Sequence, residues 1–354
     1  MGGTCFLCKK SSPFLSGALG TCLECIRNKF DEVSPHIEKL HSQNRKEFNL
    51  RPFPPKAVGG VRCRICSNGC IIPEGERGYC NLRENRRGRL KHLGGTPQKG
   101  FLQYYYDLLP TNCVAEWVCP ERTHHGYKNL AVFYESCSFN CLFCQNWHWR
   151  ESMFLSHSIN AEELAEKVDD RTACICYFGG DPAPQILHAI KTSKLVLRKK
   201  KDTRICWETN GTIQRRFLEV VANLSLESGG CIKFDLKAFN ENLNIALTGI
   251  SNKTTLANFT FLSRYFKERP TPPFLIASSL LIPGYIDEEE VANIAEFIAS
   301  LNPDIPYSLL AFYPAFQMND TPVTPRKLAM NCYKIAREAG LTNVHIGNIH
   351  LLSS

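Results

Sequence analysis

Long apolar runs are absent from this chain of 354 residues. No stretch approaches the roughly 20 apolar residues that span a bilayer, and the N-terminus lacks the positive-then-apolar pattern of a secretory signal. The composition of a disordered chain is absent too, because 44% of the residues are hydrophobic and the charges are mixed. We therefore expect a globular cytoplasmic protein without a membrane segment, with one large domain and one or two small ones.

The net charge of +8 is moderate. Its densest patches are Arg83–Lys91 and Arg198–Lys201. Neither run is accompanied by the aromatic motif of an RNA-binding module, which favours two solvated faces. A site for RNA or for an acidic partner is the alternative.

Cysteine, in contrast, is abundant. Many of the 18 cysteines fall into C-x2-C pairs, unlike the scattered cysteines of a small secreted framework. In a reducing compartment such pairs indicate metal binding rather than disulfides.

The central motif is Cys137-x3-Cys141-x2-Cys144, which follows a predicted buried strand at Leu130–Tyr134. Three thiolates can hold three irons of a [4Fe–4S] cluster, which usually has four cysteine ligands. The fourth iron would then be open to a small molecule. A zinc site completed by a distant Cys or His is the alternative.

Two further cysteine groups precede this motif. Cys5, Cys8, Cys22 and Cys25 form two knuckles, which predict a structural four-thiolate zinc site, with a rubredoxin-like iron site as the alternative. The second group, which can hold zinc or an auxiliary iron–sulfur cluster, contains Cys63, Cys66, Cys70 and Cys80.

Cys113 and Cys119 match no standard ligand spacing. We interpret them as buried free thiols, with a further metal position as the alternative.

Composition divides the chain into four parts. Residues 1–30 form a zinc-ribbon-like module, and 31–60 form a helix and a Pro-rich linker that suits independent attachment. Residues 61–126 form the Cys-rich segment with the second metal site, and 127–354 form the main domain.

From residue 130 onward, strands alternate with amphipathic helices, which is typical of a parallel α/β fold. The predicted strands are 130–134, 173–178, 204–207, 231–234, 274–281, 307–310 and 344–346. The predicted helices are 161–168, 184–198, 254–266, 288–300 and 325–339, with Asn160 and Asp287 as N-caps and Gly340 as a stop.

Small or polar residues follow each predicted strand, and in a parallel α/β barrel these loops open on one face. After the cysteine motif they are 179–182, 208–211, 235–237, 283–284, 312–314 and 347–348. Turn chemistry explains the Gly and Pro residues, but it does not explain Glu208, Asn210, Asp235 and Lys237 at successive strand ends.

On these motifs the sequence resembles the radical S-adenosylmethionine (SAM) enzymes. The run Cys144-Gln-Asn-Trp147 is most similar to the radical SAM members of the AmmeMemoRadiSam system, relatives of the glycyl-radical-enzyme activases. The resemblance covers about residues 61–350. It implies a partial (β/α)6-type barrel in which SAM chelates the open iron, and one electron cleaves the sulfonium to a 5′-deoxyadenosyl radical.

The resemblance also implies SAM-binding residues. The Gly-Gly-acid-Pro segment would bind the amino group, the acid-Thr-Asn-Gly segment the ribose and carboxylate side, and Ile282-Pro-Gly284 and an aromatic residue the adenine. The residues matched in this way are Phe143, Gly179, Gly180, Asp181, Pro182, Glu208, Asn210, Asp235, Lys237 and Pro283.

These features predict an enzyme that removes hydrogen from a protein, peptide or RNA substrate and takes electrons from a flavodoxin- or ferredoxin-like reductant. A glycyl-radical-enzyme activase is one alternative, although Tyr313 stands where activases usually have a His. A non-catalytic, zinc-rich nucleic-acid-binding or scaffold protein is the other. No general base or nucleophile can be assigned from the sequence.

Overall fold

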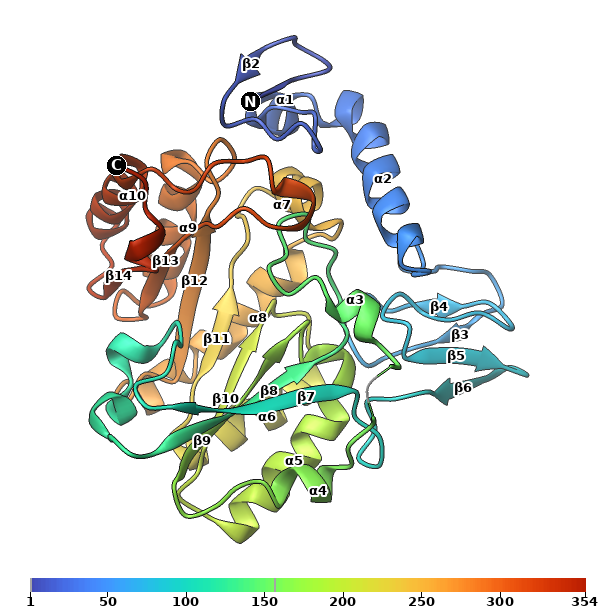
Figure 1. The fold of residues 1–354 in the computed structure, drawn as a ribbon, viewed down its shortest axis with the longest axis vertical. Coiled ribbons are helices and arrows are strands. Elements are labelled where there is room, and N and C mark those ends of the chain that lie inside the picture. The colour runs from blue at the N-terminus through green and yellow to red at the C-terminus, as the bar shows by residue number, and fades with distance from the viewer. Residues whose placement is uncertain (1, 156) are drawn as a thin grey trace.

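The computed structural model describes residues 2–155 and 157–354, and its main feature is a single eight-stranded sheet (Figure 1). The strand order is β14-β13-β12-β11-β10-β9-β8-β7, with β8–β14 parallel and β7 antiparallel to β8. The bounds are β7 Leu102–Leu108, β8 Lys128–Tyr134, β9 Thr172–Gly179, β10 Arg204–Thr209, β11 Ile232–Asp235, β12 Leu275–Leu281, β13 Tyr307–Ala311 and β14 Val344–Gly347. All seven predicted strands and the α/β class are confirmed, whereas β7 was missed.

Most helices cover the outer face of this sheet (Figure 1). The bounds of the helices after β8 are α3 Trp149–Ser152, α4 Ala161–Ala165, α5 Ile186–Lys199, α6 Arg215–Ser228, α7 Glu241–Thr248, α8 Lys253–Ser263, α9 Glu288–Leu301 and α10 Arg326–Glu338. Helix α3, in contrast, follows the cysteine motif, and α7 contacts that motif and the N-terminal segment. The capping predictions are confirmed, because Asn160 accepts a hydrogen bond from Glu163 N and Asp287 accepts one from Glu290 N. Helices α6 and α7 were not predicted. Each ends at a glycine with a positive φ, Gly229 and Gly249.

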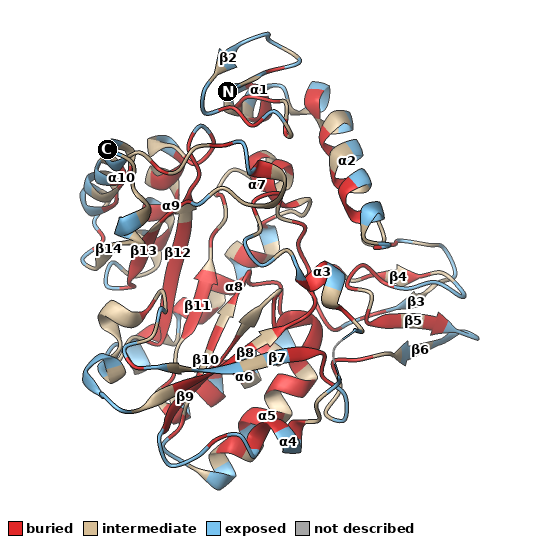
Figure 2. Cartoon of the chain, in the orientation of Figure 1, coloured by how far each residue is buried: buried red, intermediate tan, exposed pale blue. Residues whose placement is uncertain are grey.

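Alternation along the strands separates the outer face of the sheet from the barrel interior. On β9 the buried Tyr177 points outward, where it receives a hydrogen bond from Ser193 of α5, and its ring lies against Trp207 of β10. The side chain of Cys176 therefore points inward. Figure 2 shows that strands such as β8, β9, β12 and β13 are mostly buried, whereas the edge strand β7 is partly exposed.

The N-terminal segment is docked on the barrel. It contains β1 Gly3–Thr4, β2 Ser11–Ser12 and α1 Leu23–Asn28, and α2 Phe30–Glu47 leads from it to the Cys-rich segment (Figure 1). Arg27 forms a two-pronged ion pair with Asp287, at 2.8 and 3.0 Å, and also contacts the buried Glu290 at 3.1 Å. Tyr285 accepts a hydrogen bond from Ser16 N. The N-terminal segment is thus held on the barrel by these contacts as well as by the chain that follows it.

The Cys-rich segment consists of two short hairpins, β3 Val61–Arg62 with β4 Ile71–Ile72, and β5 Arg83–Arg86 with β6 Arg89–His92. It packs directly against the loop that carries the central cysteine motif. Asn68 Nδ2 donates to Ser138 O at 2.8 Å, and Ser67 N donates to Thr212 O at 2.8 Å. The second cysteine group thus lies next to the predicted cluster loop.

The segment between β7 and β8 joins the two ends of the sheet. Trp117 stacks on His345 of β14, and its Nε1 donates to Ser308 Oγ of β13. Glu121 in the same segment pairs with Arg204 at 2.6 Å. This segment, residues 109–123, is called the plug below, because it closes the end of the barrel at which β8 starts. Among the described residues, no helix is long and apolar enough to cross a membrane.

Candidate active site and metal centres

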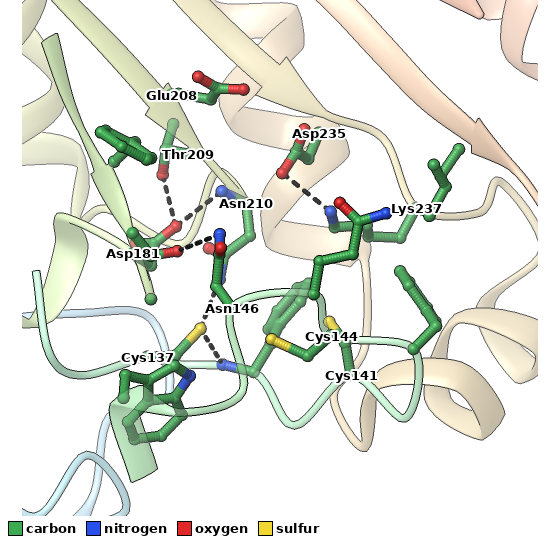
Figure 3. A pocket seen from close by; sticks show the side chains of 18 of the residues that line it. Cys137, Cys141, Cys144, Asn146, Asp181, Glu208, Thr209, Asn210, Asp235 and Lys237 are labelled. Carbon is green, nitrogen blue, oxygen red and sulfur yellow. Dashed lines mark hydrogen bonds and ion pairs between the residues drawn. The ribbon is translucent and has the colours of Figure 1, made fainter. Parts of the chain in front are cut away.

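A cavity lies where the parallel strands end, and the central cysteine motif forms one of its walls (Figure 3). Residues from five neighbouring strands and the loops that follow them, β9 to β13, complete it. The lining residues are Cys137, Phe139, Cys141, Phe143, Cys144, Gln145, Asn146, Trp149, Arg150, Phe178, Gly179, Gly180, Asp181, Glu208, Thr209, Asn210, Asp235, Lys237, Ser278, Leu280 and Leu310.

Most of the predicted SAM-binding residues meet at this cavity. Eight of the ten line it: Phe143, Gly179, Gly180, Asp181, Glu208, Asn210, Asp235 and Lys237. Pro182 and Pro283 do not. Pro283 is buried, and a Cβ on the neighbouring Gly284 would lie 2.6 Å from the carbonyl oxygen of Phe14. The turn after β12 therefore packs against the docked N-terminal segment, a contact that no local pattern could reveal.

Asp181 joins two strand-end loops. Its carboxylate accepts hydrogen bonds from Ala183 N at 2.7 Å, Asn210 N at 2.7 Å and Thr209 Oγ1 at 3.0 Å. Burial raises the pKa of this carboxyl to about 6, against the lowering effect of the three donors. Because its oxygens are already used, Asp181 fixes the loops after β9 and β10 rather than offering a free carboxylate.

The two glycines after β9 are required by packing. Gly179 has φ +107°, and a Cβ there would overlap the backbone of Tyr134. A Cβ on Gly180 would overlap the carbonyl oxygen of Ser136, the residue before Cys137. These glycines let the β9 loop lie directly on the cysteine loop, so close approach to a ligand is not needed to explain them.

The thiol of Cys137 receives two hydrogen bonds. Phe139 N donates at 3.4 Å and Asn210 Nδ2 at 3.7 Å. Burial, and after it the charge of Asp181, raise the pKa of Cys137 well above its usual value. A metal that binds Cys137 must overcome the cost of deprotonating this thiol. The two hydrogen-bond donors reduce that cost because they stabilise the thiolate. The donor set therefore fits a thiolate-bound iron–sulfur cluster, whose potential depends on hydrogen bonds to sulfur.

An ion pair occupies the opposite wall of the cavity. Lys237 Nζ lies 2.8 Å from Asp235 Oδ2, and Ser278 Oγ donates to Asp235 Oδ1 at 2.9 Å. Burial alone would lower the pKa of Lys237, but Asp235 and then the Cys141 thiol raise it above its ordinary value. Glu208 lies beside them and is partly exposed. Two carboxylates and one ammonium thus face the three thiols (Figure 3).

Sequence patterns missed the buried cations around the thiols. Arg45 of α2 is fully buried; its Nε and Nη2 donate to the carbonyls of Arg51 and Tyr79. Arg83 and Arg150 are also buried. Within the described residues, none of these three arginines forms a salt bridge, and each leaves one side-chain nitrogen without a partner. Buried cations without carboxylates are costly, and they suit thiols that become anionic on ligating a metal.

The zinc prediction for the N-terminal cysteines fits the geometry. Cys5 and Cys25 have sulfur atoms 3.8 Å apart, and those of Cys8 and Cys22 are 3.6 Å apart. A tetrahedral zinc with Zn–S bonds of about 2.3 Å places sulfur atoms about 3.8 Å apart. Of the residues described, these four form the one group of three or more Cys, His, Asp or Glu whose ligand atoms all lie within 4.8 Å. The site fits a metal, although its geometry does not identify which metal.

The second cysteine group lines one small cavity with the buried Arg83, but its thiols are less tightly gathered. Cys113 and Cys119, interpreted as buried free thiols, are partly buried and line another cavity.

Comparison with known proteins fits this geometry. Residues 131–298, from β8 into α9, match the Radical SAM superfamily. The chain contains a radical SAM domain. It is 27% identical over 310 residues to the uncharacterized protein MJ0808 of Methanocaldococcus jannaschii, covering 82% of this chain and 81% of that protein.

Two activating enzymes are also similar to this radical SAM protein. The pyruvate formate-lyase 1-activating enzyme of Escherichia coli is 25% identical over 175 residues, covering 47% of this chain and 66% of the enzyme. The isethionate sulfite-lyase activating enzyme of Desulfovibrio desulfuricans is 31% identical over 139 residues, covering 38% and 40%. The chain spans less than two thirds of either enzyme. It is an enzyme of the radical SAM class, related to these activating enzymes.

Proposed function

We propose that this protein reductively cleaves SAM at a [4Fe–4S] cluster held by Cys137, Cys141 and Cys144, and removes a hydrogen atom from a protein or peptide substrate. The main support for this proposal is that these three cysteines and the polar residues at the strand ends line the same cavity. The bound cluster supplies the electron that cleaves the sulfonium of SAM. A scaffold protein would not need such a cavity.

Different residues of the cavity would bind different parts of SAM. Asp181 holds the β9 and β10 loops together, so that the backbone carbonyls at Gly179 and Gly180 can accept hydrogen bonds from the amino group of SAM. The Glu208 carboxylate is available for the ribose hydroxyls, and Lys237 is the cation nearest to a ligand carboxylate. Phe143 lines the same cavity and offers an aromatic face to the adenine.

A protein or peptide substrate is supported by the two activating-enzyme relatives, whose names describe activation of a lyase. The exposed rim residues Gln145 and Asn146 leave the cavity accessible from the surface. Activation of a glycyl-radical enzyme is the second candidate. Against it, Tyr313 occupies the position where a His was expected, is 55% exposed and does not line the cavity.

The test is anaerobic SAM cleavage with dithionite as the reductant, measured as 5′-deoxyadenosine by chromatography. We expect product from the reconstituted protein, and a fall of at least about 100-fold in Cys137→Ala, Cys141→Ala and Cys144→Ala, because the remaining thiols cannot retain the cluster. Cys332→Ala is the matched control, since Cys332 is buried on α10 and does not line the cavity. Cleavage at the wild-type rate in any of the three variants would contradict the assignment.

A further inference from the structure

A second cavity inside the barrel is lined by six cysteines. They come from the plug, from β9, from β10 and from the residue before β11: Cys113, Cys119, Cys174, Cys176, Cys206 and Cys231. The cavity lies on the plug side of the SAM cavity, and Phe178 and Glu208 line both. Cysteines with a purely structural role have no reason to line one cavity together. Cysteines that ligate a metal must lie close to one another.

A fully buried lysine lies among these thiols. Lys233 Nζ is 3.1 Å from both Cys113 Sγ and Cys176 Sγ, and 3.6 Å from the carboxylate of Glu208. Neutral thiols are weak acceptors, and a buried ammonium needs a close anion. Thiolates, rather than thiols, are therefore the natural partners of this lysine.

The remaining contacts also favour thiolates. Cys231 donates a hydrogen bond to Cys206, with the sulfur atoms 3.9 Å apart. The Cys206 sulfur is therefore an acceptor, a role that suits a thiolate because a neutral thiol accepts only weakly. Cys174 differs, because its thiol donates to Asn129 Oδ1 at 3.2 Å. It already has a polar partner within the barrel wall.

Strand register places three of the thiols in one row. Cys206 is the Cα partner of Cys176, and Trp207 pairs with Ile232, which sets Cys206 beside Cys231. Neighbouring strands lie about 4.8 Å apart, so Cys176 and Cys231 are about twice that distance apart at Cα. A single tetrahedral zinc needs all its sulfur ligands about 3.8 Å apart. Three cysteines spread over three strands, with Cys113 of the plug opposite them, therefore fit a cluster of several metal ions better than a single zinc ion.

We propose that Cys113, Cys176, Cys206 and Cys231 ligate an iron–sulfur cluster inside the barrel, with Lys233 as its counter-cation. The cavity volume of about 90 Å³ is several times the roughly 10–15 Å³ that one water needs, so the space accepts a polyatomic group. Four cysteine thiolates are the usual ligand set of such clusters. This centre is separate from the three-thiol site at the strand ends, and it does not depend on the proposed SAM chemistry.

The test measures iron and acid-labile sulfide in the full-length chain after anaerobic reconstitution with ferrous iron and sulfide. The background carries Cys137→Ser, Cys141→Ser and Cys144→Ser, which removes the strand-end cluster. Adding Cys113→Ser and Cys206→Ser should lower iron by about two to four atoms per chain, with matching sulfide. Adding Cys332→Ser instead should change neither. Equal iron in the two proteins overturns the proposal, and a loss of zinc in place of iron overturns the cluster.

A second measurement uses the wild-type chain and therefore does not depend on folding of the variants. Cysteine alkylation is mapped by mass spectrometry before and after anaerobic treatment with an iron chelator. Labelling of Cys113 and Cys206 should rise several-fold when iron is removed, while labelling of Cys332 stays constant. Labelling that does not respond to iron removal overturns the proposal.

Discussion

The N-terminal thiols and the thiols of the cluster loop come from equally short cysteine spacings, yet the fold surrounds them differently. The sulfur atoms at the N-terminus are already at the spacing of a tetrahedral ion, and the pKa shifts of Cys5, Cys22 and Cys25 arise from burial and from the neighbouring knuckle residues. The three thiols of the cluster loop are not gathered within 4.8 Å of one another in this way, and the cations Lys237 and Arg150 both act on the Cys141 thiol. Cysteine spacing in the sequence thus predicts metal binding. The number of thiols and the neighbouring cations distinguish a closed site, in which four thiols can surround one metal ion, from an open site, in which three thiols leave a metal position for a ligand.

Removing the closed site should have the largest effect on stability. In Cys22→Ser/Cys25→Ser, we expect loss of about one zinc per chain and of several kcal/mol of unfolding free energy, because zinc binding is coupled to folding of a segment with little core. SAM cleavage at low temperature should persist. Zinc and iron are measured by mass spectrometry and stability by urea unfolding. If Cys22→Ser/Cys25→Ser lost iron and kept zinc, the N-terminal cysteines would not form a separate zinc site.

Breaking the contact between the two regions should cost less. Arg27→Met removes the partner of Asp287 and of the buried Glu290, and we expect a loss of roughly 3 kcal/mol with zinc retained. Lys253→Met is the control, since Lys253 pairs with Glu241 while 78% exposed and should cost less than about 1 kcal/mol. Equal shifts of the urea midpoint in the two variants would mean that the docking is weak.

The smallest effect concerns Asp181 in the open site. Its folded-state pKa of about 6 lies above the ordinary value of 3.8, so the stability it contributes is complete below about pH 4 and is lost as the pH rises through 6. Between pH 5 and 7.5, the metal-free protein should lose about 1–2 kcal/mol more than Asp181→Asn. Identical pH profiles in urea unfolding would show that Asp181 is not a buried carboxylate of this kind.

The strands and most of the active-site cavity could be predicted because both depend on local pattern. Apolar runs such as Leu130–Tyr134 predict buried strands, and parallel strands bring their end loops together whatever the details of packing. Strand β7 was missed because it is a largely exposed edge strand without a buried apolar run, and among the described residues it pairs only with β8. Its Tyr104–Tyr106 run nevertheless favours a strand.

What the sequence could not reveal are contacts between distant residues. Gly284, next to Pro283, packs against Phe14, which lies far away in the chain. Lys233 could not be predicted as a site residue because a single lysine within a predicted strand forms no recognisable motif. Its surroundings come from the plug and two other strands. Arg45 lies in the helix predicted within residues 31–60, and nothing in the sequence marks it as buried beside Tyr79.

The ion pair between Arg27 and Asp287 sets an order of events during synthesis of the chain. The knuckle thiols Cys5 and Cys25 are 20 residues apart, so a metal can close this loop as soon as the segment leaves the ribosome. Its docking partner follows 260 residues later, a delay on the order of tens of seconds at about 5–20 residues per second. An N-terminal segment that has bound a metal is therefore folded well before its docking partners, Asp287 and α9, have been made.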